Sequence, residues 1–324
     1  MLNTSSLLQV AAEAAGDQHH PTGALYVVGT PIGNVADVTL RAVHVLALVD
    51  AIACEDTRHS APLLRRLGIE KPLVALHQHN ERAASAAVLD RLARGERVAY
   101  ISDAGTPAIS DPGAELVAAA RTAGYRVVPI PGASSVVAAL SVSGDADGSD
   151  FTFSGFLPAR GKERELALGR LATDALRTVL FEAPHRIAAL AEGLATRCPE
   201  RRVTVCRELT KQFETIATLR AKELPDWLAA DATRLRGEFV IVLHAVAPSP
   251  PTTDPVSALD ATSDGTLRKL LEMLPLKQAV AVAAELSAAP RNLLYARALQ
   301  LKQGETAATA AVSDPTLPNP RGTA

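Results

Sequence analysis

Short apolar runs that end in glycine- or proline-containing loops alternate with helical segments along the first half of this chain. Runs of this kind predict buried strands, and the longer amphipathic segments between them predict helices. Strands that alternate with helices at this spacing indicate β-α units and a mainly parallel sheet. The expected strands cover residues 25–28, 50–53, 97–101 and 126–130, and the expected helices cover 38–48, 83–94 and 113–123.

The polar, glycine-rich stretch at residues 143–150 interrupts this pattern and is a predicted domain boundary. Beyond it the α/β pattern resumes. Further strands are expected at residues 151–153, 178–181, 203–206 and 239–243, with helices between them. We therefore predict an N-terminal α/β domain over residues 23–143 and a second α/β domain over residues 150–246.

The remaining segments have different compositions. Residues 1–22 are polar and alanine-rich and are predicted to be a disordered extension. Residues 247–262, rich in Pro, Ser, Thr and Asp, are a predicted linker. Residues 263–303 are expected to form a small helical, helix-turn-helix-like module, with six basic and three acidic side chains. The Ala/Thr/Pro-rich residues 304–324 are a predicted disordered tail.

The composition excludes several classes of protein. Apolar residues make up 48% of the chain, which excludes disorder for its bulk, and a net charge of −2 excludes a polybasic binder. The three cysteines form no Cys-x-x-Cys pair, so neither a disulfide framework nor a zinc ribbon is expected, and no metal is predicted. We find no signal-peptide pattern and no apolar run of about 20 residues, so a cytoplasmic protein without a membrane span is expected.

Three loops follow the predicted strands of the first domain, at the sheet edge where open α/β folds bind ligands. The first, Gly29-Thr30-Pro31-Ile32-Gly33-Asn34, is not the dinucleotide fingerprint, and Pro31 removes a backbone donor that a phosphate would need. The first loop therefore argues against NAD as the cofactor. A plain strand-to-helix turn is an alternative interpretation of the same residues.

The second loop, residues 102–113, contains two prolines, two glycines and two aspartates. Its length favours a binding loop, in which Asp103 could accept hydrogen bonds from a ribose or an ammonium group; alternatively, Asp103 and Asp111 only cap turns. The third loop, residues 131–135, opens an apolar helix. Ser134 or Ser135 is a natural N-cap there, and the helix N-terminus also offers backbone N–H groups to a ligand.

An ordered series of segments resembles the tetrapyrrole-methylase superfamily. Within it, the chain resembles the branch that methylates a ribose 2′-hydroxyl in small-subunit ribosomal RNA. Two departures are Phe181, where tyrosine is expected, and Gln78, where glutamate is common. The matching segments are LYVVGTPIGN (25–34), ACEDTRHS (53–60), HQHNE (77–81), YISDAGTPAISDPG (100–113), PIPGASS (129–135), FSGFLP (153–158), FEAPHR (181–186), RELTKQFE (207–214) and GEFV (237–240).

The resemblance implies two α/β domains with an S-adenosylmethionine cleft between them, a homodimer, and 16S ribosomal RNA or the small ribosomal subunit as partner. It implies 2′-O-methylation of a cytidine ribose, with cofactor contacts made largely through backbone. The implied cofactor-binding residues are Gly29, Pro31, Gly33, Asp103, Gly105, Thr106, Ser134, Ser135, Glu182, Thr210 and Glu238.

Charged side chains beside these loops supply candidates for the chemistry. A ribose hydroxyl is a weak nucleophile, so a base or hydrogen-bond acceptor should assist it. Glu55 and Asp56 directly follow a predicted strand and are the first candidates. Lys211 is a further candidate. The candidates for contacts with RNA are Arg58, Asn80, Arg186 and Arg207. For each charge, a surface salt bridge or a helix cap is the alternative.

Two other functions fit parts of the pattern. A small-molecule methyltransferase that acts on a corrinoid or porphyrin precursor would share the fold, but it would not need the basic C-terminal module. A non-catalytic RNA-binding protein would not need the intact cofactor loops.

Overall fold

The computed structural model describes residues 4–77, 80–146, 150–246, 259, 261–287 and 289–312. The chain forms two compact units, residues 1–247 and residues 248–324, which are described separately. The first unit contains two five-stranded sheets, each the centre of one lobe. Gln78, one of the departures noted in the sequence, lies outside the described residues, as does most of the predicted linker.

The sheet of the first lobe is entirely parallel, with the strand order β3-β2-β4-β1-β5. The order places β1 between β4 and β5, so the loops that leave these three strands emerge side by side. The strands are β1 (Ala24–Val28), β2 (Ala51–Cys54), β3 (Leu73–Ala75), β4 (Val98–Ile101) and β5 (Arg126–Ile130).

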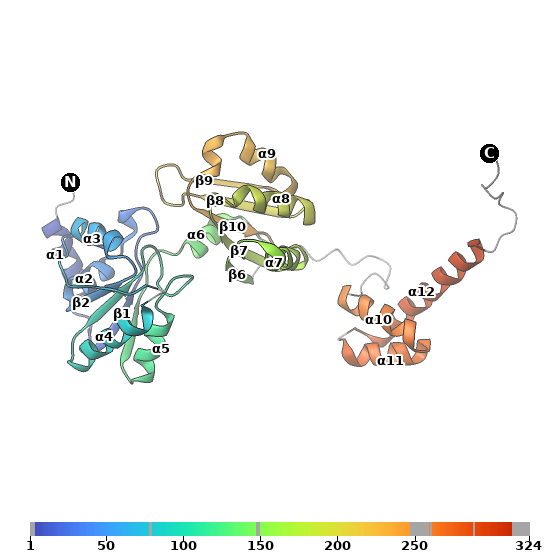
Figure 1. Cartoon of the computed structure of the whole chain (residues 1–324), viewed down its shortest axis with the longest axis horizontal. Helices are drawn as coiled ribbons and strands as arrows, with labels where there is room; N and C mark the ends of the chain where they lie inside the picture. Colours follow the sequence, from blue (N-terminus) through green and yellow to red (C-terminus); the bar gives the residue numbers. More distant parts are fainter. Residues whose placement is uncertain are drawn as a thin grey trace. The chain divides into compact units, whose positions relative to one another are not determined.

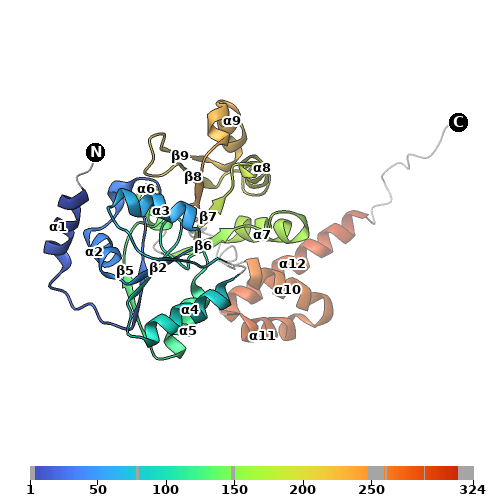
Figure 2. The same cartoon turned by 60° about the vertical axis from the view of Figure 1, so that its left-hand side comes forward.

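Helices cover both faces of this sheet (Figure 2). Side chains alternate along each strand: Tyr26 of β1 joins the core under α2 and α3, whereas Leu25 joins the core under α4 and α5. Cys54 is buried as a small apolar residue in the same core as Tyr26. The helices are α2 (Leu40–Leu48), α3 (Thr57–Arg66), α4 (Glu81–Ala93) and α5 (Ala114–Thr122), with the 3₁₀ turn η1 (Val35–Asp37).

The second lobe has a mixed sheet with the strand order β6-β7-β10-β8-β9. Within it, β6 and β7 are parallel, and the other neighbouring pairs are antiparallel. The strands are β6 (Phe151–Phe156), β7 (Arg177–Glu182), β8 (Arg202–Arg207), β9 (Thr215–Arg220) and β10 (Phe239–Leu243).

One face of the second sheet packs against three helices, and the other face packs against α6 (Ser135–Val142). Because α6 directly follows β5 of the first lobe, the chain crosses between the lobes through this helix (Figure 1). The other helices are α7 (Gly161–Thr173), α8 (Ile187–Arg197) and α9 (Leu224–Ala229), with the 3₁₀ turns η2 (Ala221–Glu223) and η3 (Ala232–Leu235).

The N-terminal segment differs from the expectation of a disordered extension over residues 1–22. Residues Thr4–Ala15 form a helix, α1, that packs against α2. Ala11 and Ala15 are buried, and Leu7 and Leu8 contact the core of the first lobe. The composition looked polar overall, but these apolar residues recur at the three- and four-residue spacing that places them on one helical face.

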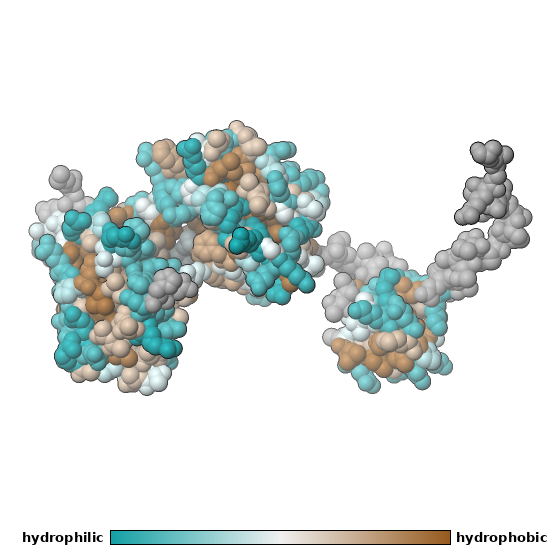
Figure 3. Space-filling view, viewed as in Figure 1, coloured by the Kyte–Doolittle hydropathy of each residue, from teal (hydrophilic) through white to brown (hydrophobic). Residues whose placement is uncertain are grey.

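The second unit is a three-helix module around a small apolar core. Its helices are α10 (Ala261–Met273), α11 (Leu276–Leu286) and α12 (Arg291–Val312). The tail predicted to be disordered from residue 304 therefore begins as a continuation of α12, since the alanine-rich segment has high helix propensity. Met273 and Leu286 are exposed on the module, whose surface carries an apolar area in Figure 3. No helix in the described part of the chain is long and apolar enough to span a membrane.

Candidate functional site

The three glycine- and proline-rich loops meet at the carboxyl edge of the first sheet, where they are joined by backbone contacts. Thr30 and Gly105 exchange N–H···O hydrogen bonds of 2.8 and 3.2 Å, which join the first loop to the second. Gly29 and Gly132 pack backbone against backbone: a Cβ on Gly29 would lie 2.8 Å from the Gly132 N and Cα atoms. The glycines of the first and third loops are therefore required for close packing.

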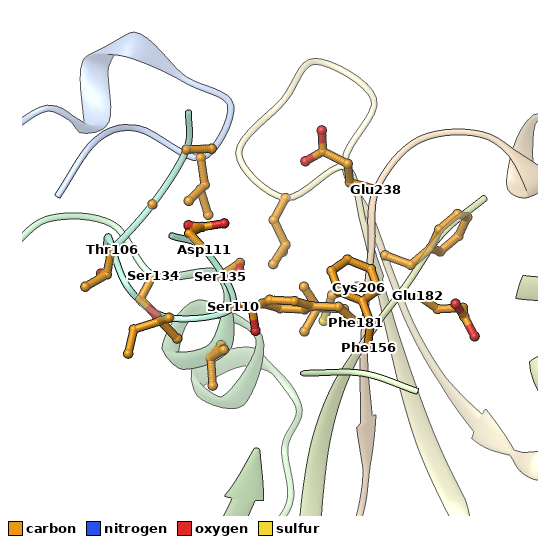
Figure 4. A pocket seen from close by; sticks show the side chains of 18 of the residues that line it. Thr106, Ser110, Asp111, Ser134, Ser135, Phe156, Phe181, Glu182, Cys206 and Glu238 are labelled. Carbon is orange, nitrogen blue, oxygen red and sulfur yellow. The ribbon is translucent and has the colours of Figure 1, made fainter. Parts of the chain in front are cut away.

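A cavity of about 350 Å³ lies between this loop edge and the second sheet. Its volume falls in the range of roughly 300–1,000 Å³ that is typical of small-molecule sites. Figure 4 shows side chains from both lobes around it. It is lined by Ile32, Ala104, Gly105, Thr106, Ile109, Ser110, Asp111, Ser134, Ser135, Val136, Phe156, Phe181, Glu182, Ala183, Pro184, Cys206, Leu209, Glu238, Phe239 and Val240.

Six of the predicted cofactor-binding residues line this cavity. They come from three of the four predicted regions: the second loop, the start of α6, and the second lobe at the end of β7 and just before β10. They are Gly105, Thr106, Ser134, Ser135, Glu182 and Glu238. Ser134 occupies the N-cap position of α6 as predicted, but its side chain makes no capping hydrogen bond.

The other five predicted cofactor-binding residues do not line the cavity. Gly29 and Pro31 are buried in the first loop, whereas their neighbour Ile32 reaches the cavity. Gly33 contacts the second lobe: a Cβ there would lie 2.5 Å from Lys211 Cγ and 3.0 Å from Thr210 Oγ1. Gly33 and Thr210 therefore form a contact between the lobes, next to the cavity.

Asp103 points away from the cavity. Its carboxylate accepts a hydrogen bond from the Asp56 backbone N–H at 3.2 Å and lies 2.9 Å from His59 Nδ1. The hydrogen bond to Asp103 is the main cause of a raised pKa at His59. In this structure the Asp103 carboxylate links the second loop to the start of α3, and its contact with the cofactor stays a prediction.

Glu182 reaches the cavity from the end of β7, but its carboxylate is fully buried in a network of ion pairs. Arg164 Nη2 lies 3.1 Å from Glu182 Oε2, and Arg186 Nε lies 2.9 Å from Oε1. Arg186 also donates to the Leu157 carbonyl. Its guanidinium is therefore engaged within the lobe, and its contact with RNA stays a prediction.

Lys211 pairs with two carboxylates, Glu208 at 3.0 Å and Glu238 at 3.1 Å. Burial alone would lower the pKa of Lys211, but hydrogen bonds to the two glutamates raise it. Lys211 is therefore a fixed cation beside the cavity and cannot accept a proton near neutral pH.

The pKa values of the two acidic candidates after β2 are shifted in opposite directions. Asp56 is the N-cap of α3 and accepts hydrogen bonds from the Arg58 backbone and guanidinium, which hold its pKa far below the usual range. Glu55 is half-buried, and burial together with the nearby Asp103 and Asp111 carboxylates raises its pKa. Asp56 is thus the weaker base of the two.

The remaining predicted RNA contacts lie in three different environments. Arg58 is highly exposed, with 87% of its side chain accessible. The Asn80 side chain bonds to the His77 N–H and the Ala75 carbonyl and so shapes the loop before α4. Arg207 is buried and donates to the carbonyls of Arg236 and Phe213, and its contact with RNA stays a prediction.

The structure adds site residues that were not predicted. Phe156 and Phe181 line the cavity with their rings 5.5 Å apart in an edge-to-face arrangement. Burial raises the pKa of the Cys206 thiol to about 12, so the thiol stays protonated. Asp111 also lines the cavity. Each lies in or beside a quoted motif, but only the fold shows which side chains face the cavity.

The parallel sheet, the second mixed sheet and the cavity at the strand ends define a two-lobed α/β enzyme that binds a small molecule between its lobes. Residues 24–225 match the family described as tetrapyrrole (corrin/porphyrin) methylases, and residues 257–302 match the RsmI C-terminal HTH domain.

Curated relatives cover most of the chain. A ribosomal RNA small subunit methyltransferase I from Neisseria meningitidis is 44% identical over 86% of this chain and 94% of the relative. The protein of the same name from Pseudomonas aeruginosa is 46% identical over 88% of this chain and 99% of the relative.

Solved structures share the fold of the first unit. A uroporphyrin-III-C-methyltransferase from Thermus thermophilus superposes with a TM-score of 0.51 at 23% identity, and covers 68% of this chain and 94% of its own. A cobalt precorrin-4 methyltransferase superposes with a TM-score of 0.52 at 19% identity, and covers 69% and 98%. The chain belongs to the tetrapyrrole methylase family and is a methyltransferase.

Proposed function

We propose that this protein methylates the 2′-hydroxyl of a cytidine ribose in the 16S RNA of the small ribosomal subunit, with S-adenosylmethionine as the methyl donor. The observation that carries the proposal is the full-length similarity to proteins named ribosomal RNA small subunit methyltransferase I, at 44–46% identity. The match of residues 257–302 to the RsmI C-terminal domain supports it independently of the catalytic lobes.

The cavity fits S-adenosylmethionine. Phe156 and Phe181 offer aromatic surface to an adenine ring, and aromatic rings also attract sulfonium cations. The Ser134–Ser135 turn presents the N-terminus of α6, and the Ala104–Thr106 backbone lines the same side. When bound, the cofactor supplies an electrophilic methyl group on a positively charged sulfur.

The protein must then hold the acceptor oxygen in line with the methyl group and exclude water. Gly33 contacts Lys211 and Thr210 between the lobes, next to the Ile32 and Leu209 side chains that line the cavity. Glu55, with its raised pKa, is better suited than Asp56 to contact the acceptor. Lys211 contributes fixed positive charge beside the cavity.

The RNA surface that we propose lies on the lobe faces next to this contact. A groove is lined there by Gly33, Asn34, Val35, Arg66, Thr210, Lys211 and Gln212. Arg66 is exposed in this groove, Arg58 is exposed on the same helix, and Phe213 has 69% of its area exposed next to Gln212. Cations of this kind contact phosphates, and an exposed aromatic ring can stack on an unpaired base.

We also propose that the protein is cytoplasmic and homodimeric, and that the C-terminal module adds to RNA binding. A corrinoid or porphyrin methyltransferase is the less favoured function. The two solved structures with such titles are 23% and 19% identical to this chain, and their likeness to it extends to the fold alone.

The proposal is tested by mapping ribose methylation on small-subunit RNA from cells with and without the gene. We expect one cytidine 2′-O-methyl group to disappear in the deletion strain and to return with the gene. Purified protein should bind S-adenosylmethionine in calorimetry after treatment with a chelator. An unchanged RNA methylation map, or binding of NAD instead of S-adenosylmethionine, would contradict the proposal.

A further inference from the structure

The second loop, which follows β4, is fixed to both neighbouring loops near its start. Gly105 exchanges backbone hydrogen bonds with Thr30 of the first loop, and the Thr106 hydroxyl donates to the Ala133 carbonyl of the third loop at 3.3 Å. The later half of the loop contributes residues 109–111 to the cavity wall. The position of that half depends on what holds the loop at its end.

The later half of the loop has a backbone conformation that its surroundings must maintain. Ala108 and Ser110 are left-handed, with φ of 65° and 66°, a region that residues other than glycine rarely adopt. Such conformations persist only where the rest of the structure enforces them. Contacts at the end of the loop are therefore needed to keep this part of the wall in place.

Glu81, in the first turn of α4, anchors the end of the loop. Its Oε1 atom accepts hydrogen bonds from the N–H groups of Gly113 and Glu115, at 2.8 and 3.1 Å. These groups open α5, whose N-cap residue is Gly113 and has no side chain with which to cap the helix. The Glu81 carboxylate supplies that cap from a different helix. Its negative charge lies at the N-termini of α4 and α5, where helix dipoles favour it.

Tyr100 supports the same end of the loop from β4. Its hydroxyl donates to the Pro112 carbonyl, and its ring lies against the Gly113 backbone. Gly113 has a φ of 114°, and a Cβ there would lie 2.1 Å from the Tyr100 Cε1 atom. Because Tyr100 is fully buried, this support is rigid. Tyr100 and Glu81 together fix where the loop ends.

We propose that Glu81 is a positioning residue for methyl transfer, which holds residues 109–111 where they form the cavity wall. This inference rests on the proposed function, in which the cavity binds S-adenosylmethionine. Glu81 does not line the cavity, so its effect on the donor passes through the loop. Loss of the carboxylate should release the loop end and weaken donor binding, while the reaction of donor that is already bound stays nearly unchanged.

The test compares Glu81→Ala and Glu81→Gln with wild type in calorimetry with S-adenosylmethionine, at a temperature at which circular dichroism shows all three folded. We expect Glu81→Ala to bind the donor about tenfold more weakly, which is the size of effect that loss of a helix cap has. Glu81→Gln keeps an acceptor oxygen at the same position and should recover most of the affinity. Asp90→Ala removes an exposed acidic side chain from the same helix and is the matched control, which should bind like wild type.

Two further measurements separate positioning from a general effect on stability. With 16S RNA, Glu81→Ala should raise the KM for S-adenosylmethionine and leave kcat at saturation within about threefold of wild type, as loss of donor binding alone does. Hydrogen exchange with mass spectrometry tests the loop without cofactor or RNA. The peptide over residues 106–115 should exchange faster in Glu81→Ala than in wild type or Asp90→Ala. A residue that only stabilised the fold would speed exchange throughout the first lobe.

Wild-type donor affinity and unchanged exchange of residues 106–115 in Glu81→Ala would overturn the inference while leaving the proposed function intact. A fall in kcat with unchanged donor affinity would also overturn it, because donor binding would then not depend on Glu81. If Glu81→Ala does not fold, Glu81→Asp replaces it, since the shorter side chain should not reach both N–H groups. Wild-type affinity in a folded Glu81→Asp protein would then overturn the inference. Absence of S-adenosylmethionine binding by the wild-type protein would instead count against the proposed function.

Discussion

At the scale of single residues, the cavity depends on positions where a side chain cannot be added. Gly29 shows this most clearly, because the atoms that a Cβ would meet belong to the Gly132 backbone and cannot rotate away. The effect of a methyl group at Gly29 should therefore reach the third loop and the Ser134–Ser135 turn that follows it.

We expect Gly29→Ala to lower the free energy of unfolding by about 1–3 kcal/mol, as overpacking usually does, and to weaken S-adenosylmethionine binding at least tenfold. Urea unfolding and calorimetry measure the two effects. Gly169→Ala is the matched control, because Gly169 lies in α7 with nothing within 4 Å of an added Cβ. That change should stabilise the protein by about 0.5–1 kcal/mol. If Gly29→Ala and Gly169→Ala have the same stability and the same affinity for S-adenosylmethionine, close packing at Gly29 is not required.

The His59–Asp103 pair gives a pH dependence whose sign is defined. The folded-state pKa of His59 is raised above its ordinary value of about 6.5, mainly by the hydrogen bond to Asp103. The stabilisation from the charged imidazole is therefore complete below about pH 6.5 and is lost as the pH rises through the raised pKa. Because the pair is exposed, the effect should be small.

We accordingly expect His59→Gln to be less stable than wild type at about pH 5.5 and to approach it at about pH 8.5, above the ordinary histidine pKa. Urea midpoints at the two pH values provide the measurement. His185→Gln, at an exposed histidine in the second lobe, is the control and should show no such trend. If the stability difference between wild type and His59→Gln instead grows with pH, the charged His59–Asp103 pair is not its cause.

At the scale of secondary-structure elements, α1 is an integral part of the first lobe. Ala11 has no exposed surface and faces the α2 side of the core, whereas the neighbouring Val10 is 48% exposed. The two positions are adjacent in sequence but lie on opposite sides of the packed face. They therefore compare a buried position with an exposed position on the same helix.

We expect Ala11→Asp to lower the free energy of unfolding by about 2 kcal/mol or more, because it buries a charge without a partner. Val10→Asp should change it by less than about 0.5 kcal/mol, as exposed substitutions usually do. Urea unfolding measures both. If the two variants are equally stable, α1 does not contribute to the fold in solution.

At the scale of the whole molecule, the division after residue 247 separates the catalytic lobes from the helical module. The module has its own core, formed by residues such as Leu267, Val280 and Leu294, so each unit can keep its structure without the other. The basic excess of the module is modest: Arg268 and Arg297 both pair with Asp264.

A protein truncated after Ala247 should therefore bind S-adenosylmethionine with unchanged affinity but bind or methylate 16S RNA more weakly. The ratio of full-length to truncated affinity should be greatest at low salt and should shrink as salt rises, because the phosphate contacts of the module act by releasing counterions. Filter binding across a salt series, with calorimetry on the same sample, measures both properties. Equal RNA affinity of the truncated and full-length proteins would rule out a role of the module in RNA binding.

The oligomeric state is the other property of the whole molecule that we predict. Light scattering at micromolar concentration should give twice the chain mass of 33.9 kDa. The truncated protein provides the comparison, because a dimer that persists without residues 248–324 must be formed by the catalytic lobes. A monomer mass for the full chain would contradict the homodimer without affecting the assigned family.

The sequence by itself determined the alternation of strands and helices, because burial imposes a periodicity that local residues reveal. The predicted strands at 126–130 and 239–243 match β5 and β10 as observed. The sequence also located the three loops that meet at the edge of the first sheet, since glycine and proline restrict backbone geometry locally. It missed α1, whose small apolar face is recognised only once α2 packs against it.

The tertiary structure decided which side chains act together. Asp103 and Asp111 lie in one loop and look alike in the sequence, yet Asp103 pairs with His59 while Asp111 faces the cavity. Arg186 and Arg207 looked available for RNA, but their guanidinium groups bond within the second lobe. The direction of a side chain depends on contacts between segments far apart in the chain, and these contacts exist only after the chain has folded.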